Sequence, residues 1–173
     1  MSIVTTDRLT LREMTPSDLD DMAALLGDEQ VMRYYPRTKT RDEARRWIEW
    51  NRSLYRDHGF GLWAITLTET GAFVGDCGLT IQRIDGVDEV EVGYHVRTEY
   101  QRRGYATEAA AASRDLARDR YSIGRLIAVI NADNQPSTAV AERIGLRFEK
   151  HASVYGQDRL IYAANLAGLG RPG

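Results

Sequence analysis

The alternation of hydrophobic and polar positions predicts a chain of strands and helices. Residues 8–13 alternate between the two kinds, as a half-buried strand does. Capping signals at residues 15–18 and 40–43 then each open a helix that carries one apolar stripe. Short turns join the next runs into an antiparallel meander. The strands predicted in this meander are 62–67, 72–81 and 89–96.

The second half of the chain predicts two more helices and three more strands. Residues 104–120 are rich in alanine, and small side chains let a helix lie close to a sheet. Residues 126–130 are continuously apolar, as in a strand covered on both faces. Asn134 fits the N-cap of a short helix that Gly145 ends. The last expected segments are strands 146–150 and 159–166 and a disordered tail, 167–173.

This order, β-α-α-β-β-β-α-β-α-β-β, predicts an α/β protein with a mixed sheet and helices on its faces. The chain has 173 residues, which suits a single domain, residues 1–173, with a core at about 6–166. The formal net charge is −2, without blocks of like charge, so no nucleic-acid partner is expected.

Composition also argues against membrane insertion, disulfides and metal binding. No apolar run is long enough to span a bilayer, and the first residues lack the apolar core of a signal peptide. Cys77 is the only cysteine, and the three histidines show no metal-ligand spacing. We therefore expect a cytoplasmic protein that holds no metal and contacts no membrane.

The stretch at residues 101–106 follows a predicted strand and opens the alanine-rich helix. A loop in this context points backbone N–H groups outward, where the helix dipole adds about half a positive charge. Phosphate oxygens bind readily at such a place. Arg102 and Arg103 can add charge at its rim, and Gly104 lets the backbone approach a ligand closely. The alternative is an ordinary loop that caps a helix.

Three motifs in order resemble those of the GNAT N-acetyltransferase superfamily. The loop Gln101-x-x-Gly104-x-Ala106 resembles its acyl-CoA pyrophosphate loop, Gln/Arg-x-x-Gly-x-Gly/Ala. The segment 91–96, Glu-Val-Gly-Tyr-His-Val, resembles its central strand, and Asn134-x-x-Ser137 resembles its short second-half helix. The resemblance extends from about residue 6 to 166. It implies a GNAT-like fold, with a central mixed, mostly antiparallel sheet flanked by helices, and acetyl-CoA as co-substrate.

The opening residues 6–12, Thr-Asp-Arg-Leu-x-Leu-Arg, resemble one branch of that superfamily, the RimJ/RimL-like ribosomal-protein N-terminal acetyltransferases. Dimers are common in that branch, so a homodimer is possible. In the superfamily, backbone groups of the central strand bind the pantetheine arm like an added strand. The resemblance implies these cofactor-binding residues: Tyr94, His95, Val96, Gln101, Arg102, Arg103, Gly104, Tyr105, Ala106, Thr107, Asn131, Asn134 and Ser137.

Two residues are candidates for catalysis. Many superfamily members have a tyrosine that protonates the leaving thiolate seven residues after the asparagine, but this chain has Ala141 there. Ser137 is therefore the candidate acid, and its alternative role is to support the start of the helix. Glu91 interrupts an apolar strand and is the candidate base, with a cross-strand partner as the alternative role. His95 is a weaker candidate base.

Acetyl transfer needs a neutral amine near the thioester carbon and a donor for the oxyanion, here a backbone N–H near residues 94–96. An α-amine with a pKa of about 8 is roughly one tenth neutral at pH 7, and a lysine with a pKa of about 10.4 far less. An N-terminal acceptor is therefore the less demanding one. Tyr34, Tyr35 and Trp47 are expected in the acceptor pocket, unless they only pack a connector.

The function predicted is an acetyl-CoA-dependent N-acetyltransferase. It would act on a primary amine, either a protein N-terminus or a small molecule, by direct attack in a ternary complex. Two alternatives stay open: an acetyltransferase that modifies small molecules or antibiotics, and an acyl-CoA-binding sensor without turnover.

Overall fold

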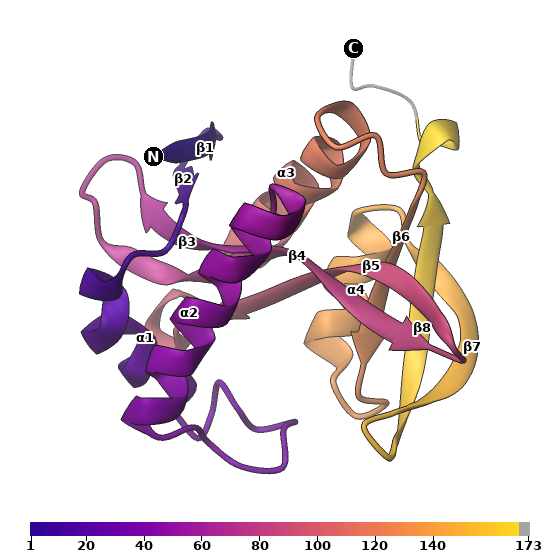
Figure 1. The fold of residues 1–173 in the computed structure, drawn as a ribbon, viewed down its shortest axis with the longest axis horizontal. Helices are drawn as coiled ribbons and strands as arrows, with labels where there is room; N and C mark the ends of the chain where they lie inside the picture. The colour runs from indigo at the N-terminus through magenta and orange to yellow at the C-terminus, as the bar shows by residue number, and fades with distance from the viewer. Residues whose placement is uncertain (170–173) are drawn as a thin grey trace.

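The computed structural model describes residues 1–169, which build one eight-stranded sheet with helices on both faces (Figure 1). The strand order is β1-β2-β3-β4-β5-β6-β8-β7. Every neighbouring pair is antiparallel except β5 and β6. The strands are β1 (Ser2–Thr5), β2 (Leu9–Arg12), β3 (Leu62–Leu67), β4 (Phe73–Ile84), β5 (Val87–Val96), β6 (Arg125–Ile130), β7 (Arg147–Val154) and β8 (Gln157–Asn165). The α-helices are α1 (Leu19–Leu26), α2 (Arg41–His58), α3 (Tyr105–Asp119) and α4 (Gln135–Arg143).

The predicted mixed α/β fold is confirmed, although β4 and β7 extend beyond the ends predicted for them. Two further predictions differ from the structure. The sequence pattern missed β1, because its residues Ser-Ile-Val-Thr do not alternate between polar and apolar. The prediction of a disordered tail is wrong for residues 167–169. Leu166–Gly168 form a 3₁₀-helix, and Leu169 packs against the main core. The rest of the expected tail, residues 170–173, lies outside the described residues.

Each face of the sheet has its own core. On one face, α1 and α2 pack their apolar stripes over Leu62, Ala64 and Phe73. On the other face, α3 and α4 pack over Trp63 and Ile65 and their neighbours. In Figure 1 α2 lies in front of the sheet and α3 behind it. Because successive side chains of a strand alternate between faces, each central strand serves both cores.

The strands β5 and β6 separate soon after they meet. Their parallel pairing is confined to Glu91 and Ile127. Beyond that point β5 stays paired with β4 as far as Val96, and β6 stays paired with β8. Alternate backbone N–H and C=O groups of β5 after Glu91 therefore face the gap between the two halves of the sheet.

Two glycines of β4 allow the central strands to pack closely. A Cβ atom added at Gly75 would lie 1.9 Å from the carbonyl oxygen of His95. One added at Gly78 would lie 2.1 Å from the carbonyl oxygen of Gly61. No side chain fits at either position, so the backbone can approach closely only at glycine.

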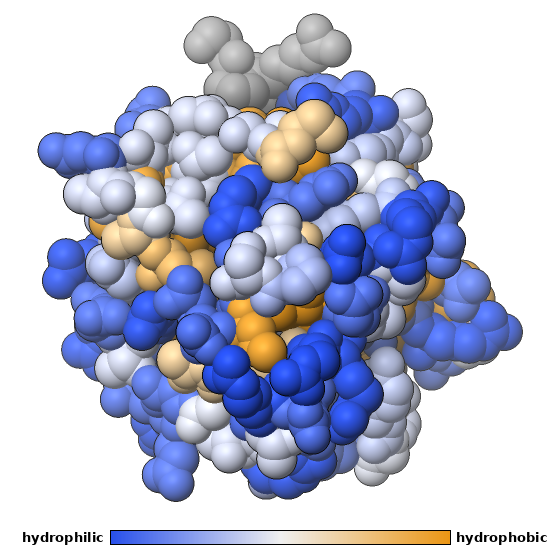
Figure 2. Space-filling model, turned by 60° about the vertical axis from the view of Figure 1, so that its left-hand side comes forward, coloured by the Kyte–Doolittle hydropathy of each residue, from blue (hydrophilic) through white to orange (hydrophobic). Residues whose placement is uncertain are grey.

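The surface is mainly polar. Hydrophilic residues dominate the face in Figure 2, and apolar residues occupy only small areas of it. Among residues 1–169, none of the helices combines the length and the apolar character needed to cross a bilayer.

Candidate active site

The loop before α3 turns the chain sharply onto the helix N-terminus. Arg102 and Gly104 both have left-handed backbones, with φ of +61° and +82°. The first amide to enter the helical pattern is that of Glu108, which bonds the carbonyl of Gly104 at 3.0 Å. The amides of residues 105–107 precede it at the positive end of the helix dipole. This geometry suits an anionic ligand such as a pyrophosphate.

Arg8 holds this loop from the β2 side, a role that the sequence pattern did not reveal. Its guanidinium donates to the Arg103 carbonyl at 2.9 Å, pairs with Glu108 at 2.7 Å, and lies 4.5 Å from the centre of the Tyr105 ring. Burial alone would raise the pKa of Glu108, but hydrogen bonds from Thr6 and Arg8 lower it overall. Glu108 therefore stays ionised and keeps Arg8 in place.

The side chains of Gln101 and Asn131 bind the protein itself. Gln101 donates to the Val96 carbonyl at 3.0 Å and so braces the loop against the end of β5. Asn131, just after β6, donates to the Tyr34 carbonyl at 3.4 Å and accepts from the Asp133 amide. These two side chains stabilise the predicted cofactor site, and any contact of theirs with a ligand stays a prediction.

The connector at residues 27–40 spans the ends of the two separating strands. It contacts Asn131 through the Tyr34 carbonyl, and Asp28 accepts from Thr98, just after β5, at 3.2 Å. The irregular aromatic segment predicted for the acceptor pocket therefore covers the open end of the gap between β5 and β6.

At the start of α4, Asn134 caps the helix as predicted, because its side chain accepts from the Ser137 amide at 3.1 Å. The Tyr94 hydroxyl donates to the Ser137 carbonyl at 2.7 Å and lies 3.0 Å from the Ser137 hydroxyl oxygen. Since Tyr94 has only one hydroxyl proton, Ser137 is the donor in the second bond. Ala141 is completely buried in the core. The tyrosine hydroxyl beside Ser137 thus belongs to Tyr94 of β5, and not to a tyrosine of α4 at the position of Ala141.

Glu91 lies on the opposite face of β5 from Tyr94. Thr80, its partner across the β4–β5 ladder, donates to its carboxylate at 3.3 Å. Burial raises the pKa of Glu91 to about 7, and hydrogen bonds from Gln82 and Thr80 offset only part of that effect. A carboxylate with this pKa can exchange protons near neutral pH.

A buried chain of hydrogen bonds lies on the same face as Glu91. Asp76 accepts a hydrogen bond from His95 Nδ1 at 2.7 Å and another from the Trp47 indole at 3.0 Å. His95 Nε2 is hydrogen-bonded to the Tyr35 hydroxyl at 2.7 Å. The sequence predicted these aromatics and His95 only as separate site residues. Asp76 was missed, although an aspartate inside the apolar run of β4 was the available signal.

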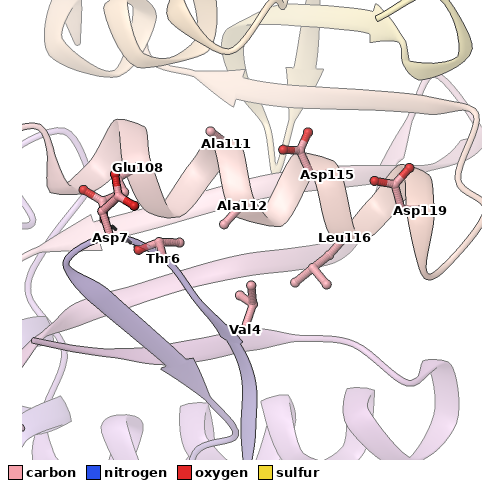
Figure 3. A pocket seen from close by; sticks show the side chains of 9 residues that line it. All are labelled: Val4, Thr6, Asp7, Glu108, Ala111, Ala112, Asp115, Leu116 and Asp119. Carbon is pink, nitrogen blue, oxygen red and sulfur yellow. Dashed lines mark hydrogen bonds between the residues drawn. The ribbon is translucent and has the colours of Figure 1, made fainter. Parts of the chain in front are cut away.

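A groove of about 570 Å³ lies elsewhere, between β1 and α3. Figure 3 shows its apolar floor and its four acidic side chains, those of Asp7, Glu108, Asp115 and Asp119. Three of these carboxylates pair with arginines, and the residues that line the groove include no lysine or arginine. The groove therefore lacks the positive charge that nucleotide phosphates need. Within residues 1–169, three or more His, Cys, Asp or Glu side chains do not gather at a place that could hold a metal ion.

The splayed strands and the amide-lined loop define the class: an acyltransferase fold of the GNAT type. The acetyltransferase (GNAT) domain family matches residues 8–147. The chain therefore belongs to the GNAT acetyltransferase family, and this membership implies acyltransferase activity.

Relatives and solved structures agree with this assignment. YkkB of Bacillus subtilis (strain 168) is 34% identical over 158 residues, which cover 91% of this chain and 92% of YkkB. The N-acetyltransferase YnaD of the same organism is 27% identical over 147 residues, covering 84% and 83%. An acetyltransferase from Agrobacterium tumefaciens str. C58 superposes with a TM-score of 0.81 at 26% identity, covering 95% and 94%.

RimL, the ribosomal L7/L12 alpha-N-protein acetyltransferase, superposes in its complex with coenzyme A. The TM-score is 0.77 at 21% identity, with 95% of this chain and 98% of RimL covered. At this identity the likeness shows a shared fold.

Proposed function

We propose that this protein is an acetyl-CoA-dependent N-acetyltransferase that acylates a primary amine by direct attack in a ternary complex. One observation carries the proposal. The strand β5 leaves β6 at Glu91, and the loop that follows β5 turns its amides outward at the N-terminus of α3. If the pantetheine arm of acetyl-CoA bound along the free edge of β5, the phosphates of acetyl-CoA would reach that loop.

The donor site is built from backbone groups. The free edge of β5 after Glu91 can bond a pantetheine arm as an added strand would. The amides of residues 105–107 face the phosphates, and Arg102 and Arg103 add charge at the rim. Acetyl-CoA supplies an activated thioester, and an N–H on the free edge of β5 is positioned to stabilise the oxyanion that forms on attack.

Glu91 is the proposed base, and its pKa favours some acceptors over others. Moving a proton from an α-amine of pKa about 8 to a carboxylate of pKa about 7 costs about 1.4 kcal/mol. For a lysine-like amine of pKa about 10.4 the same transfer costs about 4.6 kcal/mol. An α-amine or another weakly basic primary amine is therefore the acceptor that this carboxylate serves best.

Ser137 is the proposed donor to the leaving thiolate. It lies in the first turn of α4, where the helix dipole favours an anion. In the structure its hydroxyl proton points to Tyr94, so Ser137 has to turn away from Tyr94 to serve the thiolate. Tyr94 is the second source of a proton at this position, because its hydroxyl lies within 3.0 Å of that of Ser137.

The first test is thiol release from acetyl-CoA in the presence of a mixed panel of amines. An enzyme releases thiol only when amine is added, whereas a sensor binds acetyl-CoA and releases none. Binding without amine-dependent release by any member of the panel would contradict the proposed function. The loop variant Gly104→Val serves as a control, since it should weaken acetyl-CoA binding and slow thiol release together.

The acceptor class needs a second experiment. A peptide array with free N-termini, compared with a panel of small amines and aminoglycosides, separates protein acetylation from small-molecule acetylation. The connector at residues 27–40 is the acceptor-side element in this proposal. Exchanging it for that of YkkB should give the chimera the acceptor preference that YkkB shows on the same panel, while leaving acetyl-CoA affinity unchanged.

A further inference from the structure

The hydrogen-bonded chain of Asp76, His95 and Tyr35 leads from the core to the surface. Asp76 is fully buried, His95 is 8% exposed and Tyr35 is 46% exposed. The three residues come from β4, β5 and the connector at residues 27–40, and both of the bonds that link them measure 2.7 Å. The Tyr35 hydroxyl thus lies where the acceptor-side connector meets the buried face of β5.

The partners of Asp76 determine which histidine nitrogen carries a proton. Asp76 accepts at one oxygen from the Trp47 indole, which can only donate, and at the other oxygen from His95 Nδ1. Nδ1 is therefore the protonated nitrogen of neutral His95, and Nε2 presents a lone pair to Tyr35. The Tyr35 hydroxyl donates to Nε2, and a lone pair of its oxygen stays available for another donor.

We propose that Tyr35 is a catalytic residue that accepts a proton from the ammonium form of the acceptor while it passes its own proton to His95. In this proposal, which rests on the N-acetyltransferase function above, Asp76 and His95 are positioning residues. The ligand class that the Tyr35 oxygen takes is a protonated primary amine.

The step balances in protons and charge. An N–H bond of the ammonium breaks and an O–H bond forms on Tyr35, while the original O–H bond of Tyr35 breaks and an N–H bond forms at His95 Nε2. The amine becomes neutral and nucleophilic, Tyr35 stays neutral, and His95 becomes an imidazolium beside the Asp76 carboxylate. The proton later returns from His95 through Tyr35 to solvent, after the product has left.

Several charged groups influence these two side chains. Burial lowers the pKa of His95, but Asp76 and Glu91 raise it overall, and Lys39 opposes them. Burial of the hydroxyl, together with Glu91 and Asp76, raises the pKa of Tyr35, while Arg159 opposes this effect. The phenol therefore stays protonated near neutral pH, so Tyr35 conducts a proton and does not act as a phenolate base. His95 is the group that first holds the proton. The Glu91 carboxylate, the proposed base, raises the pKa of His95 and so serves the same removal of a proton from the amine.

The test is the pH dependence of Tyr35→Phe, which removes one oxygen from a partly exposed ring and so leaves the fold intact. Near pH 7 we expect kcat/KM for the amine to fall about 100-fold, the lower end of general acid–base effects. The KM for acetyl-CoA should not change. Above the pKa of the amine the loss should shrink to about threefold or less, because the amine is then neutral without help. Tyr121→Phe, the same change near the far end of α3, should behave like wild type.

Two further measurements separate a relay from a purely structural contact. Histidine NMR on this chain, which has three histidines, should show the pKa of His95 lowered in Asp76→Asn. His95→Gln should lose as much activity as Tyr35→Phe, and the double variant should lose no more, because both changes interrupt one path.

The outcomes distinguish the two proposals. A wild-type protein that releases no thiol with any amine contradicts the proposed function, and the relay with it. A wild-type protein that turns over contradicts the relay alone in either of two cases: Tyr35→Phe keeps the wild-type pH profile, or its loss is the same at every pH. A loss near pH 7 that disappears at high pH supports the relay.

Discussion

The two faces of β5 carry different chemistry. Glu91 and His95 point to the face that α2 and the connector at residues 27–40 cover, where the groups that handle protons gather. Tyr94 points to the other face, toward α4 and Ser137. In the proposed mechanism, the period of two in a strand therefore places proton removal from the amine and proton delivery to the thiolate on opposite faces of β5. Disturbing either face should leave the other intact.

The largest effect on activity should follow a change of Glu91, which lies on the face of β5 proposed to remove the proton from the amine (the amine side). Glu91→Gln removes the base, and we expect kcat near pH 7 to fall at least about 100-fold. The loss should shrink as the pH rises, because raised pH supplies neutral amine. The kcat–pH profile from pH 6 to 10 measures this, and a wild-type rate at every pH would remove Glu91 from the mechanism.

The stability of the same variant provides the control. The pKa of Glu91 in the folded protein, about 7, lies above its unfolded value. Its contribution to stability is therefore greatest below the unfolded pKa and is lost as the pH rises through 7. Removing the charge should stabilise the protein at pH 8 relative to wild type, and this difference should vanish below pH 4. A variant with a lower melting temperature at pH 8 would assign Glu91 a structural role.

The next effect should be on the thiolate side. Ser137→Ala removes a charge-assisted hydrogen bond worth roughly 1.5–3 kcal/mol, so the chemical step should slow about ten- to a hundredfold. Acetyl-CoA affinity should barely change. The helix cap should survive, because Asn134 bonds the amide of Ser137 and not its hydroxyl. Single-turnover kinetics beside the melting temperature would separate rate from stability.

Tyr94→Phe tests which of the two hydroxyls serves the thiolate. It removes the present partner of the Ser137 hydroxyl and frees that proton for the thiolate. If Ser137 is the donor, Tyr94→Phe should keep the wild-type single-turnover rate or exceed it. A slow Tyr94→Phe beside a fast Ser137→Ala would transfer the role to Tyr94.

A smaller effect is expected at residues 101–106, the loop before α3 that is proposed to bind the phosphates. Gly104 has φ of +82°, and a branched residue there costs about 1–2 kcal/mol and blocks the approach of a ligand to the backbone. Gly104→Val should weaken CoA binding at least about tenfold in calorimetry. Gly86→Val is the matched control, since Gly86 has φ of +81° in the β4–β5 turn, with no atom within 4 Å of its added Cβ. Equal CoA affinity in both variants would contradict the assignment of the loop.

The smallest effect should come from Tyr34 on the acceptor side. The loss of one aromatic contact is worth about 0.5–1.5 kcal/mol, so Tyr34→Ala should raise the acceptor KM about three- to tenfold. The KM for acetyl-CoA should change less. Phe148→Ala, which truncates an exposed aromatic on β7, is the control. Should neither KM respond, Tyr34 only packs the connector.

The two faces of β5 also differ in how far the sequence predicted them. The turn at Gly104 and the cap at Asn134 form between residues a few positions apart, so local patterns were sufficient to predict both. The contact of Arg8 with the Arg103 carbonyl spans 95 positions and was not predicted. The amine-side chain joins residues 60 and 19 positions apart, Tyr35 with His95 and His95 with Asp76. The sequence predicted Tyr35 and His95 as separate site residues, but it did not predict the hydrogen bonds that join them to each other and to Asp76.

The order of the elements, the family motifs and the alternation that places Glu91 and Tyr94 on opposite faces of β5 follow from the amino-acid sequence. Three contacts follow only from the folded chain: Arg8 with the loop before α3, the Ser137 hydroxyl with Tyr94, and Asp76 with His95. The difference comes from the range of the interactions. Turns, caps and strand alternation follow from the backbone within a few residues, whereas a hydrogen bond between distant side chains forms only after the register of β4 and β5 and the path of the connector have brought them together.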